Sequence, residues 1–435
     1  MIPGDAIIVI VTRPDSGSPN AARVQPGWPP AVVAGAYQTG INLMRDLARR
    51  GVRVCCIDCA REQPGFSTVY GPAYLCPNPD DTPAEWLAFM LDLADRLGGK
   101  PALIPSADQF VSAIAEHARV LEERFLFCRG GVTAQKLLAT KRRQYEVAEQ
   151  HGLPVPRTRL IGSGADLEAF CAEAVFPCVL KPIHFREWQR LPTSHPLYCV
   201  KVLPADSADD LCAKYALAAE ISPEVIVQEV IAGPDANKLV YLSCYSQTGE
   251  RLGHCLFRQV RTHPPHFGSA SVVEPALDDE ATDRLCDGFL RSLGYAGMCE
   301  LELKRDDRDG RVKLIEANPR YSVTSDAALY AGVDIGWLHY LDLVGQPVTP
   351  VDPAPREFRH VVLARDFATI RSHLTEGLAT WRTVLRSYKP PVAFFDFDLR
   401  DWRVTAATSL NLAKIIVRGV FPKRRSEPGP RGRGF

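Results

Sequence analysis

At 435 residues, the chain is long enough for two or three domains. Lys plus Arg and Asp plus Glu number 51 each, and a formal net charge of zero argues against general affinity for nucleic acid or anionic lipid, leaving only local patches. A hydrophobic content of 46% and a charged content of 23% are ordinary for a globular protein, so a disordered or fibrous chain is excluded.

Cysteine usage and hydropathy bear on the compartment. Thirteen scattered cysteines, an odd number, predict reduced thiols rather than a disulfide framework. Cys56 and Cys59 form a C-x-x-C pair inside an apolar strand, which we interpret as core thiols. The apolar run at residues 6–11 is too short for a signal peptide or a membrane span, so we predict a cytoplasmic protein.

The first part of the chain divides into an extension and an alternating region. Residues 1–30 combine an apolar strand with a Pro/Gly/Ser-rich stretch. Residues 31–130 predict strands that alternate with amphipathic helices, a pattern that implies a parallel sheet. The strands are expected at 31–35, 53–57, 101–105 and 125–127, and the helices at 41–50, 83–97 and 108–122. The turn G-A-Y-Q-T-G at 35–40 opens a helix and could hold an anion, but it lacks the full dinucleotide pattern.

Residues 131–349 predict a mixed arrangement in which antiparallel hairpins surround crossover helices. Strands are expected at 175–181, 225–231, 238–246 and 251–260, and helices at 206–220 and 327–345. Residues 350–404 are interpreted as a small mixed α/β appendage. Residues 405–421 predict an apolar helix, and the Pro/Gly-rich remainder up to 435 is basic and predicted to be disordered. Such a tail is either a solvated terminus or a segment that binds an anionic membrane surface.

The most informative segment is a predicted β-hairpin with strands at 299–304 and 311–316 around a turn at 306–310. If Glu302 lies across from Glu316, two like charges face each other, and a divalent cation would turn that repulsion into ligation. Asn318 adds a neutral oxygen, and Arg320 adds donors suited to phosphate. This set suits Mg²⁺, with Mn²⁺ as a substitute. The alternative is a solvated acidic hairpin with no bound metal.

These residues carry a family resemblance. The sequence E-x-N-P-R at 316–320, preceded by L-E-L-K at 301–304, resembles the metal-binding end of the ATP-grasp ligases. The similarity is closest to the carbamoyl-phosphate-synthase-like and D-aspartate-ligase-like carboxylate–amine ligases, and it extends over residues 30–345. It implies a combined α/β and α+β fold: an N-terminal parallel-sheet pre-ATP-grasp domain (31–130), a two-lobed ATP-grasp module (131–349) and the small C-terminal appendage.

The resemblance also implies an ATP site. Lys141, before G-L-P-V-P, and Lys181, at the end of an apolar strand, would contact the nucleotide phosphates. A hinge would border the adenine, with backbone groups of Glu229 and Ile231 reading its edge; its residues are Gln228, Glu229, Val230 and Ile231. Asp235 would accept from the ribose hydroxyls. From the residues alone, Lys141 could equally lie on a solvated helix face and Asp235 could be an ordinary turn residue.

Two arginines are predicted to act in catalysis. Arg261 lies in a segment similar to the family's R-x-x-P-P-x-F-G and would stabilise charge during acyl-phosphate formation, and Arg320 would offset charge on the triphosphate. Residues 182–200 contain no glycine, unlike the mobile phosphate-covering loop of many ATP-grasp enzymes. Arg190 and His195 are among the side chains that could contact phosphate there instead.

The resemblance predicts an ATP- and Mg²⁺-dependent ligase that joins a small carboxylate, such as an amino acid or short peptide, to an amine. Two alternatives stay open: a catalytically silent nucleotide-binding regulatory module, and a ligase acting on a membrane or cell-wall precursor. In similar ligases the N-terminal sheet edge contributes to the acceptor pocket, so Asp108 is either an acceptor residue or a helix N-cap. No nucleic-acid partner is expected, and a homodimer is the default assembly.

Overall fold

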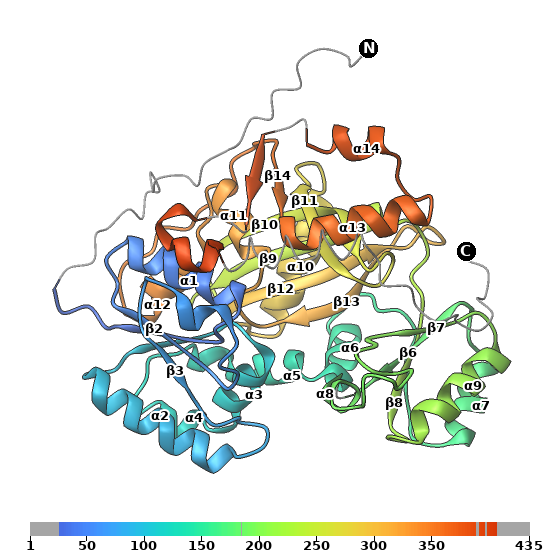
Figure 1. Ribbon diagram of the computed structural model, residues 1–435, viewed down its shortest axis with the longest axis horizontal. Helices are drawn as coiled ribbons and strands as arrows, with labels where there is room; N and C mark the ends of the chain where they lie inside the picture. Colours follow the sequence, from blue (N-terminus) through green and yellow to red (C-terminus); the bar gives the residue numbers. More distant parts are fainter. Residues whose placement is uncertain (1–25, 184, 389–390, 396–397, 407–435) are drawn as a thin grey trace.

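A computed structural model describes residues 26–183, 185–388, 391–395 and 398–406 (Figure 1). The predicted N-terminal parallel sheet is confirmed, with strand order β3-β2-β1-β4 and every pairing parallel. Its strands are β1 (Ala31–Ala34), β2 (Val54–Asp58), β3 (Ala73–Leu75) and β4 (Ala102–Pro105). The strand β3 was not predicted, and the strand predicted at 125–127 contributes only one bridge, between Ala102 and Leu126.

Helices cover both faces of this sheet. They are α1 (Gln38–Arg49), α2 (Pro83–Leu97), α3 (Asp108–Glu116) and α4 (Ala118–Leu121), with a 3₁₀ turn η1 at Pro64–Ser67. Alternate residues of β1 pack on opposite sides, Val33 with Leu47 of α1 and Val32 with Trp86 of α2. A two-sided apolar strand of this kind is typical of a parallel sheet buried between helices.

A second four-stranded sheet forms a separate small lobe, drawn in green in Figure 1. Its strand order is β5-β8-β6-β7, all antiparallel: β5 (Thr158–Ile161), β6 (Cys178–Pro182), β7 (Leu203–Ala205) and β8 (Val225–Glu229). Three helices belong to it, namely α7 (Gly164–Cys171), α8 (Phe185–Gln189) and α9 (Ala208–Ala219). The chain reaches this lobe through η2 (Arg129–Gly131), α5 (Val132–Ala139) and α6 (Lys141–Gln150).

The largest sheet has seven strands in the order β13-β12-β9-β10-β11-β14-β15. They are β9 (Lys238–Tyr245), β10 (Arg251–His263), β11 (Ser269–Pro275), β12 (Gly297–Arg305), β13 (Val312–Asn318), β14 (Arg359–Val361) and β15 (Val392–Phe394), with η3 (Asp235–Asn237) before β9. One face packs on α5, α6 and α10 (Glu280–Ser292), and the other packs on α1, α11 (Ser325–Tyr330) and α12 (Ile335–Leu343).

The predicted appendage at 350–404 is not a separate body. The strands β14 and β15 extend the large sheet beside β11, so the boundary placed at residue 350 divides one sheet. The rest of this segment comprises α13 (Leu363–Thr375), α14 (Trp381–Arg386) and η4 (Leu399–Asp401). Asp398 forms an ion pair with Arg49 at 2.7 Å, which ties the end of the described chain back to α1.

Some predictions fall outside the described residues. These are the extension up to residue 25, most of the helix predicted at 405–421 and the basic tail. No helix in the part of the chain that the structure describes is long and apolar enough to cross a membrane.

Candidate active site

The predicted carboxylate pair is present at the edge of the large sheet. Glu302 of β12 lies directly across from Glu316 of β13, and Glu300 lies across from Asn318. Leu301 and Leu303 point into the core cluster on the α10 side, so Glu300 and Glu302 point to the opposite face. The hairpin turn includes Gly310, whose φ of +70° is a conformation that glycine adopts without strain. A register shift between Leu303 and Glu302 then skips Ile315 and brings Glu316 opposite Glu302.

The carboxylates crowd one another. Burial, together with the charges of Glu300 and Glu316, raises the pKa of Glu302 to about 8, although Lys238 and Arg320 act to lower it. A carboxyl group whose pKa is raised by its own neighbours is electrostatically suited to a cation. Glu300 was not singled out from the sequence, although it occupies the strand position two residues before Glu302.

Glu300 fixes the orientation of the amide that faces the site. Its Oε1 accepts from Asn318 Nδ2 at 3.3 Å, and its Oε2 accepts from Ser322 Oγ at 2.6 Å. The oxygen Oδ1 of Asn318 is thereby turned away from Glu300, and it accepts from Arg320 Nη2 at 3.1 Å. Since a carbonyl oxygen has two lone pairs, this contact leaves Asn318 able to ligate a metal.

The donor set decides which metal fits. No group of three or more His, Cys, Asp or Glu side chains among the described residues is arranged to hold a metal ion. Mg²⁺ commonly uses one or two carboxylates together with substrate phosphates and water, whereas Zn²⁺ and Ca²⁺ sites draw most of their ligands from the protein. Glu302, Glu316 and Asn318 therefore fit Mg²⁺ that is shared with a phosphorylated substrate.

Two buried lysines that the sequence did not reveal lie on the same face. Lys238 of β9 is the register partner of Lys304 of β12, two residues along the strand from Glu302. Lys238 Nζ lies 3.0 Å from Asp235 Oδ1. Burial lowers the pKa of Lys304, and the charge of Lys238 lowers it further. Both cations are therefore close to the position where phosphate would meet the carboxylates.

The small lobe supplies another cation. Lys181 of β6 donates to Gln228 Oε1 at 2.7 Å, and Gln228 Nε2 donates to Thr158 Oγ1 at 2.8 Å. Tyr145 of α6 connects this group to the large sheet: burial raises its pKa, Gln228 lowers it, and Glu316 and Glu302 raise it. The predicted Lys181 and Gln228 therefore lie on the side of the small lobe that faces the carboxylates. Lys141 begins α6, but its side chain is outside the described residues.

Part of the predicted adenine hinge is already hydrogen-bonded to other parts of the protein. The Glu229 N–H donates to the Arg157 carbonyl at 2.9 Å, and the Val230 N–H donates to the Pro177 carbonyl at 3.0 Å. The Glu229 carboxylate accepts from the Val175 N–H at 3.0 Å. Because β-sheet neighbours already use the Glu229 N–H, this donor is excluded from the backbone groups that are predicted to read the adenine edge. Ile231 is buried beside it.

Asp235 has a structural role instead of the predicted ribose contact. Its Oδ2 accepts from Thr262 Oγ1 at 2.7 Å and from the His266 N–H at 3.0 Å, and its Oδ1 faces Lys238. Burial raises its pKa, but Lys238 and these hydrogen bonds together lower it below the usual range. A carboxylate with these partners positions Lys238 and the end of β10, and its oxygens are not directed at a ligand.

The predicted catalytic role of Arg261 also has to be revised. Its Nε and Nη2 donate to the two carboxylate oxygens of Asp366 at 2.9 and 2.7 Å, its Nη1 donates to Ser387, and Tyr388 stacks on the guanidinium. Every nitrogen of the guanidinium is used, and the side chain is 6% exposed. This geometry argues against the predicted catalytic role, because Arg261 anchors α13 and α14 to β10.

Arg320 behaves differently, because it bridges two parts of the site. Its guanidinium pairs with Asp108 at the carboxyl edge of the N-terminal sheet and also contacts Asn318. Asp108 is the first residue of α3 and does not cap that helix, so the N-cap alternative is wrong. Its carboxylate is 65% exposed, which leaves it accessible at the mouth of the site.

The glycine-free segment after Lys181 is held by packing. Trp188 and Leu197 are buried in the core of the small lobe. Arg190 pairs with Asp81 of the N-terminal domain at 2.8 Å, and His195 accepts from the Leu197 N–H at 3.1 Å. Arg190 and His195, which could contact phosphate according to the sequence, make these protein contacts in the structure.

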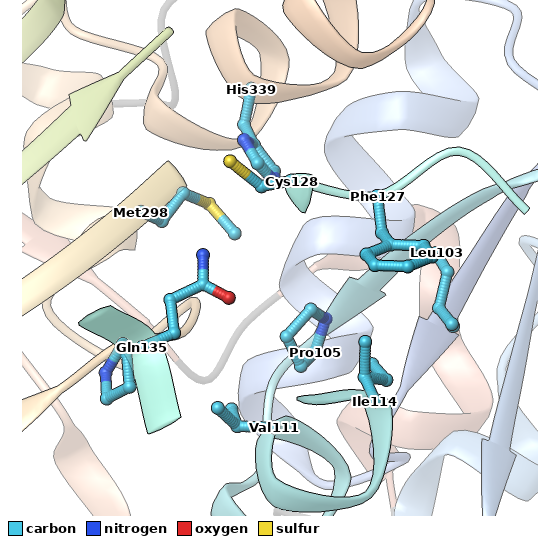
Figure 2. Close-up of a pocket in the computed structure, with 10 residues that line it drawn as sticks. Leu103, Pro105, Val111, Ile114, Phe127, Cys128, Gln135, Met298 and His339 are labelled. Carbon is cyan, nitrogen blue, oxygen red and sulfur yellow. The ribbon is translucent and has the colours of Figure 1, made fainter. Parts of the chain in front are cut away.

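A small pocket, which Pro319 helps to line, lies between the N-terminal domain and the large sheet (Figure 2). Side chains from β4, α3, α5, β12 and α12 line it, and His339 and Cys128 lie together at one side. His339 Nδ1 is buried and has no hydrogen-bond partner among the described residues. Burial lowers the pKa of His339 to about 4.

We expect the buried His339 to make the stability of the fold sensitive to acid. The unfolded chain binds a proton near pH 6.5 and the folded chain only near pH 4, so stability is complete above 6.5 and is lost as the pH falls through this window. We expect the free energy of unfolding to drop by about 2 kcal/mol between pH 7 and pH 5 from this group. His339→Leu should remove that part of the pH dependence in urea titrations, and His151→Leu, at an exposed position, should not. An unchanged pH profile in His339→Leu would contradict the assignment.

Comparisons with known proteins find ligases among the similar sequences. No family model matches the chain. It is 26% identical over 244 residues to D-aspartate ligase of Enterococcus faecium (strain Aus0004), covering 54% of this chain and 57% of that protein. It is 26% identical over 228 residues to D-alanine–D-alanine ligase of Pseudomonas entomophila (strain L48), covering 47% and 63%. In both cases the match spans less than two thirds of the relative's own length.

Solved structures match over more of the chain. N5-carboxyaminoimidazole synthetase from Staphylococcus aureus, complexed with ADP, has a TM-score of 0.62 at 14% identity and covers 82% of this chain and 88% of that one. L-amino acid ligase from Bacillus licheniformis has a TM-score of 0.56 at 16% identity, covering 72% and 74%. The chain has the ATP-grasp fold. The resemblance to ATP-grasp carboxylate–amine ligases predicted from E-x-N-P-R is thereby confirmed.

Proposed function

We propose that this ATP-grasp chain is an ATP- and Mg²⁺-dependent ligase that joins a carboxylate to an amine through an acyl phosphate. The observation that carries the proposal is the in-register pair Glu302 and Glu316, with Asn318 beside it and buried lysines on the same face. A hairpin with these charges would be unfavourable without a cation to share. Structures similar to this chain include complexes with ADP and with its magnesium salt.

The charged and polar residues of the chain would have two roles: some would hold Mg²⁺, and others would offset the charge of the phosphates. Glu302, Glu316 and Asn318 would hold Mg²⁺, which, when bound, supplies charge neutralisation for the nucleotide phosphates. Lys238 and Lys304 offset phosphate charge from the large sheet. Lys181 does so from the small lobe, and Arg320 from the edge next to the N-terminal domain. Reaction of this kind depends on positioning and charge stabilisation more than on a protein nucleophile.

The proposed reaction has two steps. A carboxylate oxygen of one substrate attacks the γ-phosphorus of ATP, ADP leaves, and an acyl phosphate forms. The amine of the second substrate then attacks the acyl carbon, phosphate leaves, and the amine nitrogen gives up a proton. The names of the sequence relatives support an amino acid as one of the two substrates. Asp108, exposed at the mouth of the site, is the candidate acceptor-side residue of the N-terminal domain.

Lys181 provides a test of nucleotide binding. Lys181→Met keeps the apolar stem and removes the charge, so we expect the affinity for Mg²⁺-ATP to fall at least about tenfold, since a hydrogen bond to a charged group contributes about 1.5–3 kcal/mol. Calorimetric titration of the variant would measure this. Lys136→Met, an exposed lysine on α5, is the matched control and should bind as the wild type does. Equal affinities for all three proteins would remove Lys181 from the phosphate site.

A measurement of ATP turnover distinguishes the regulatory alternative from a catalytically active ligase. The segment after Lys181 is packed against the protein instead of forming a glycine-rich cover, which is the observation that favours a silent module. A ligase should release ADP only when a suitable acceptor pool is added, whereas a silent module should bind Mg²⁺-ATP without turnover under any pool.

A further inference from the structure

The helices α13 and α14 form a hairpin on the outer edge of the large sheet. Residues 376–380 join them at one end, and at the other end the Tyr388 hydroxyl donates to Asp366 in the first turn of α13. The inner side of the hairpin is held to β10 by the pair Asp366–Arg261 and by a hydrogen bond between His373 and the Thr262 carbonyl. In Figure 1, α14 forms the upper border of the molecule, above α13.

Large apolar side chains are exposed along this hairpin. Phe367 is 40% exposed on α13, Leu378 is 47% exposed in the connection, and Trp381 and Leu385 are 65% and 67% exposed on α14. Trp381 and Leu385 are four residues apart and therefore share one side of α14. Exposed Trp and Leu at neighbouring positions are unfavourable in water unless a partner covers them.

The charge around these side chains is positive. Arg371, Arg382 and Arg386 are exposed on the same two helices, against Glu376 in the connection. These arginines make the surface next to Trp381 and Leu385 positive.

We propose that the outer side of the α13–α14 hairpin docks on an anionic membrane surface. Trp381 and Leu385 would enter the interface between headgroups and acyl chains, where Trp is favoured, and Arg382 and Arg386 would pair with lipid phosphates. One weak element rarely suffices for stable anchoring, but here exposed apolar side chains and arginines lie together on α14. If the partner were instead an acidic protein surface, it would attract Arg382 and Arg386, but it would not explain why Trp381 and Leu385 are exposed beside them. The proposal is independent of the ligase assignment.

Vesicle co-sedimentation of the full chain tests this directly. We expect binding to vesicles of phosphatidylcholine mixed with phosphatidylglycerol, and at least tenfold weaker binding to phosphatidylcholine alone. Trp381→Glu/Leu385→Glu should lower the partition coefficient on the mixed vesicles at least tenfold. Arg382→Gln/Arg386→Gln should lower it less and should flatten its dependence on salt.

The matched control places the same charge at exposed apolar positions elsewhere. Leu277→Glu/Val69→Glu, at sites that are 52% and 46% exposed, should bind vesicles as the wild type does. Absence of vesicle binding by the wild type would overturn the proposal. So would equal loss in the control variant, or a Trp381→Glu/Leu385→Glu variant that keeps vesicle binding but changes mass in light scattering, since that result would assign the hairpin to contact between two copies of the chain.

Discussion

Glu316→Gln is expected to lower acceptor-stimulated ADP release by about 10²–10³-fold, the range seen when one preorganised charge or donor is removed from an active site. The substitution keeps the shape of the side chain and removes one of the two carboxylates that face each other across β12 and β13. Steady-state ADP release with Mg²⁺-ATP and the stimulating acceptor pool measures the effect.

The same variant separates function from folding. Because Glu316 raises the pKa of Glu302 through like-charge repulsion, Glu316→Gln should unfold at the same or a higher urea concentration than the wild type. Glu250→Gln makes the identical chemical change at an exposed turn and should alter neither property. Wild-type turnover in Glu316→Gln would contradict the metal assignment, and lost turnover with lost stability would leave it without support.

Asp366→Ala is expected to destabilise the fold by about 3–5 kcal/mol, because it leaves the buried Arg261 guanidinium without its counter-charge. Chemical denaturation should report this as a lower midpoint. Arg261→Met/Asp366→Leu should recover much of the loss, since replacing a buried pair with apolar groups of similar size is often neutral.

The control for this prediction is a surface pair. Glu280→Ala removes the partner of Arg284 on α10, where both side chains are largely exposed, and should cost less than about 1 kcal/mol. A catalytic Arg261 would give the opposite pattern, with Asp366→Ala remaining as stable as the wild type. That outcome would return Arg261 to the active site.

Features set by short stretches of chain were predictable. The alternation in L-E-L-K places Glu302 on the opposite face from Leu301 and Leu303, as predicted, whereas the pairing of Glu302 with Glu316 also needs a register shift that skips Ile315. Likewise, the helix predicted at 83–97 is α2 with the same bounds, because Pro83 begins it and Gly98 ends it.

Features that depend on distant segments were not predictable. Lys238 and Lys304 become neighbours only because β9 pairs with β12 across an intervening hairpin and helix. Arg261 looked like a free cation beside a Pro-Pro turn, and its partner Asp366 lies 105 residues later. Asp108 and Arg320, 212 residues apart, meet only because the N-terminal sheet packs against the end of β13.

The strands β14 and β15 were not predicted from the sequence for a related reason. Each has three residues, too few for a periodic pattern, and their parallel pairing depends on the helices α13 and α14 between them. Their position beside β11 turns a predicted appendage into an extension of the large sheet.

Release of ADP, measured with and without Mg²⁺ against pooled amino acids and small carboxylates, tests whether this chain is a ligase. We expect ADP release that requires both Mg²⁺ and one particular pool, with each ADP accompanied by one phosphate and one new amide. This expectation would be contradicted by a protein that releases no ADP with any pool and shows no Mg²⁺-dependent binding of ATP.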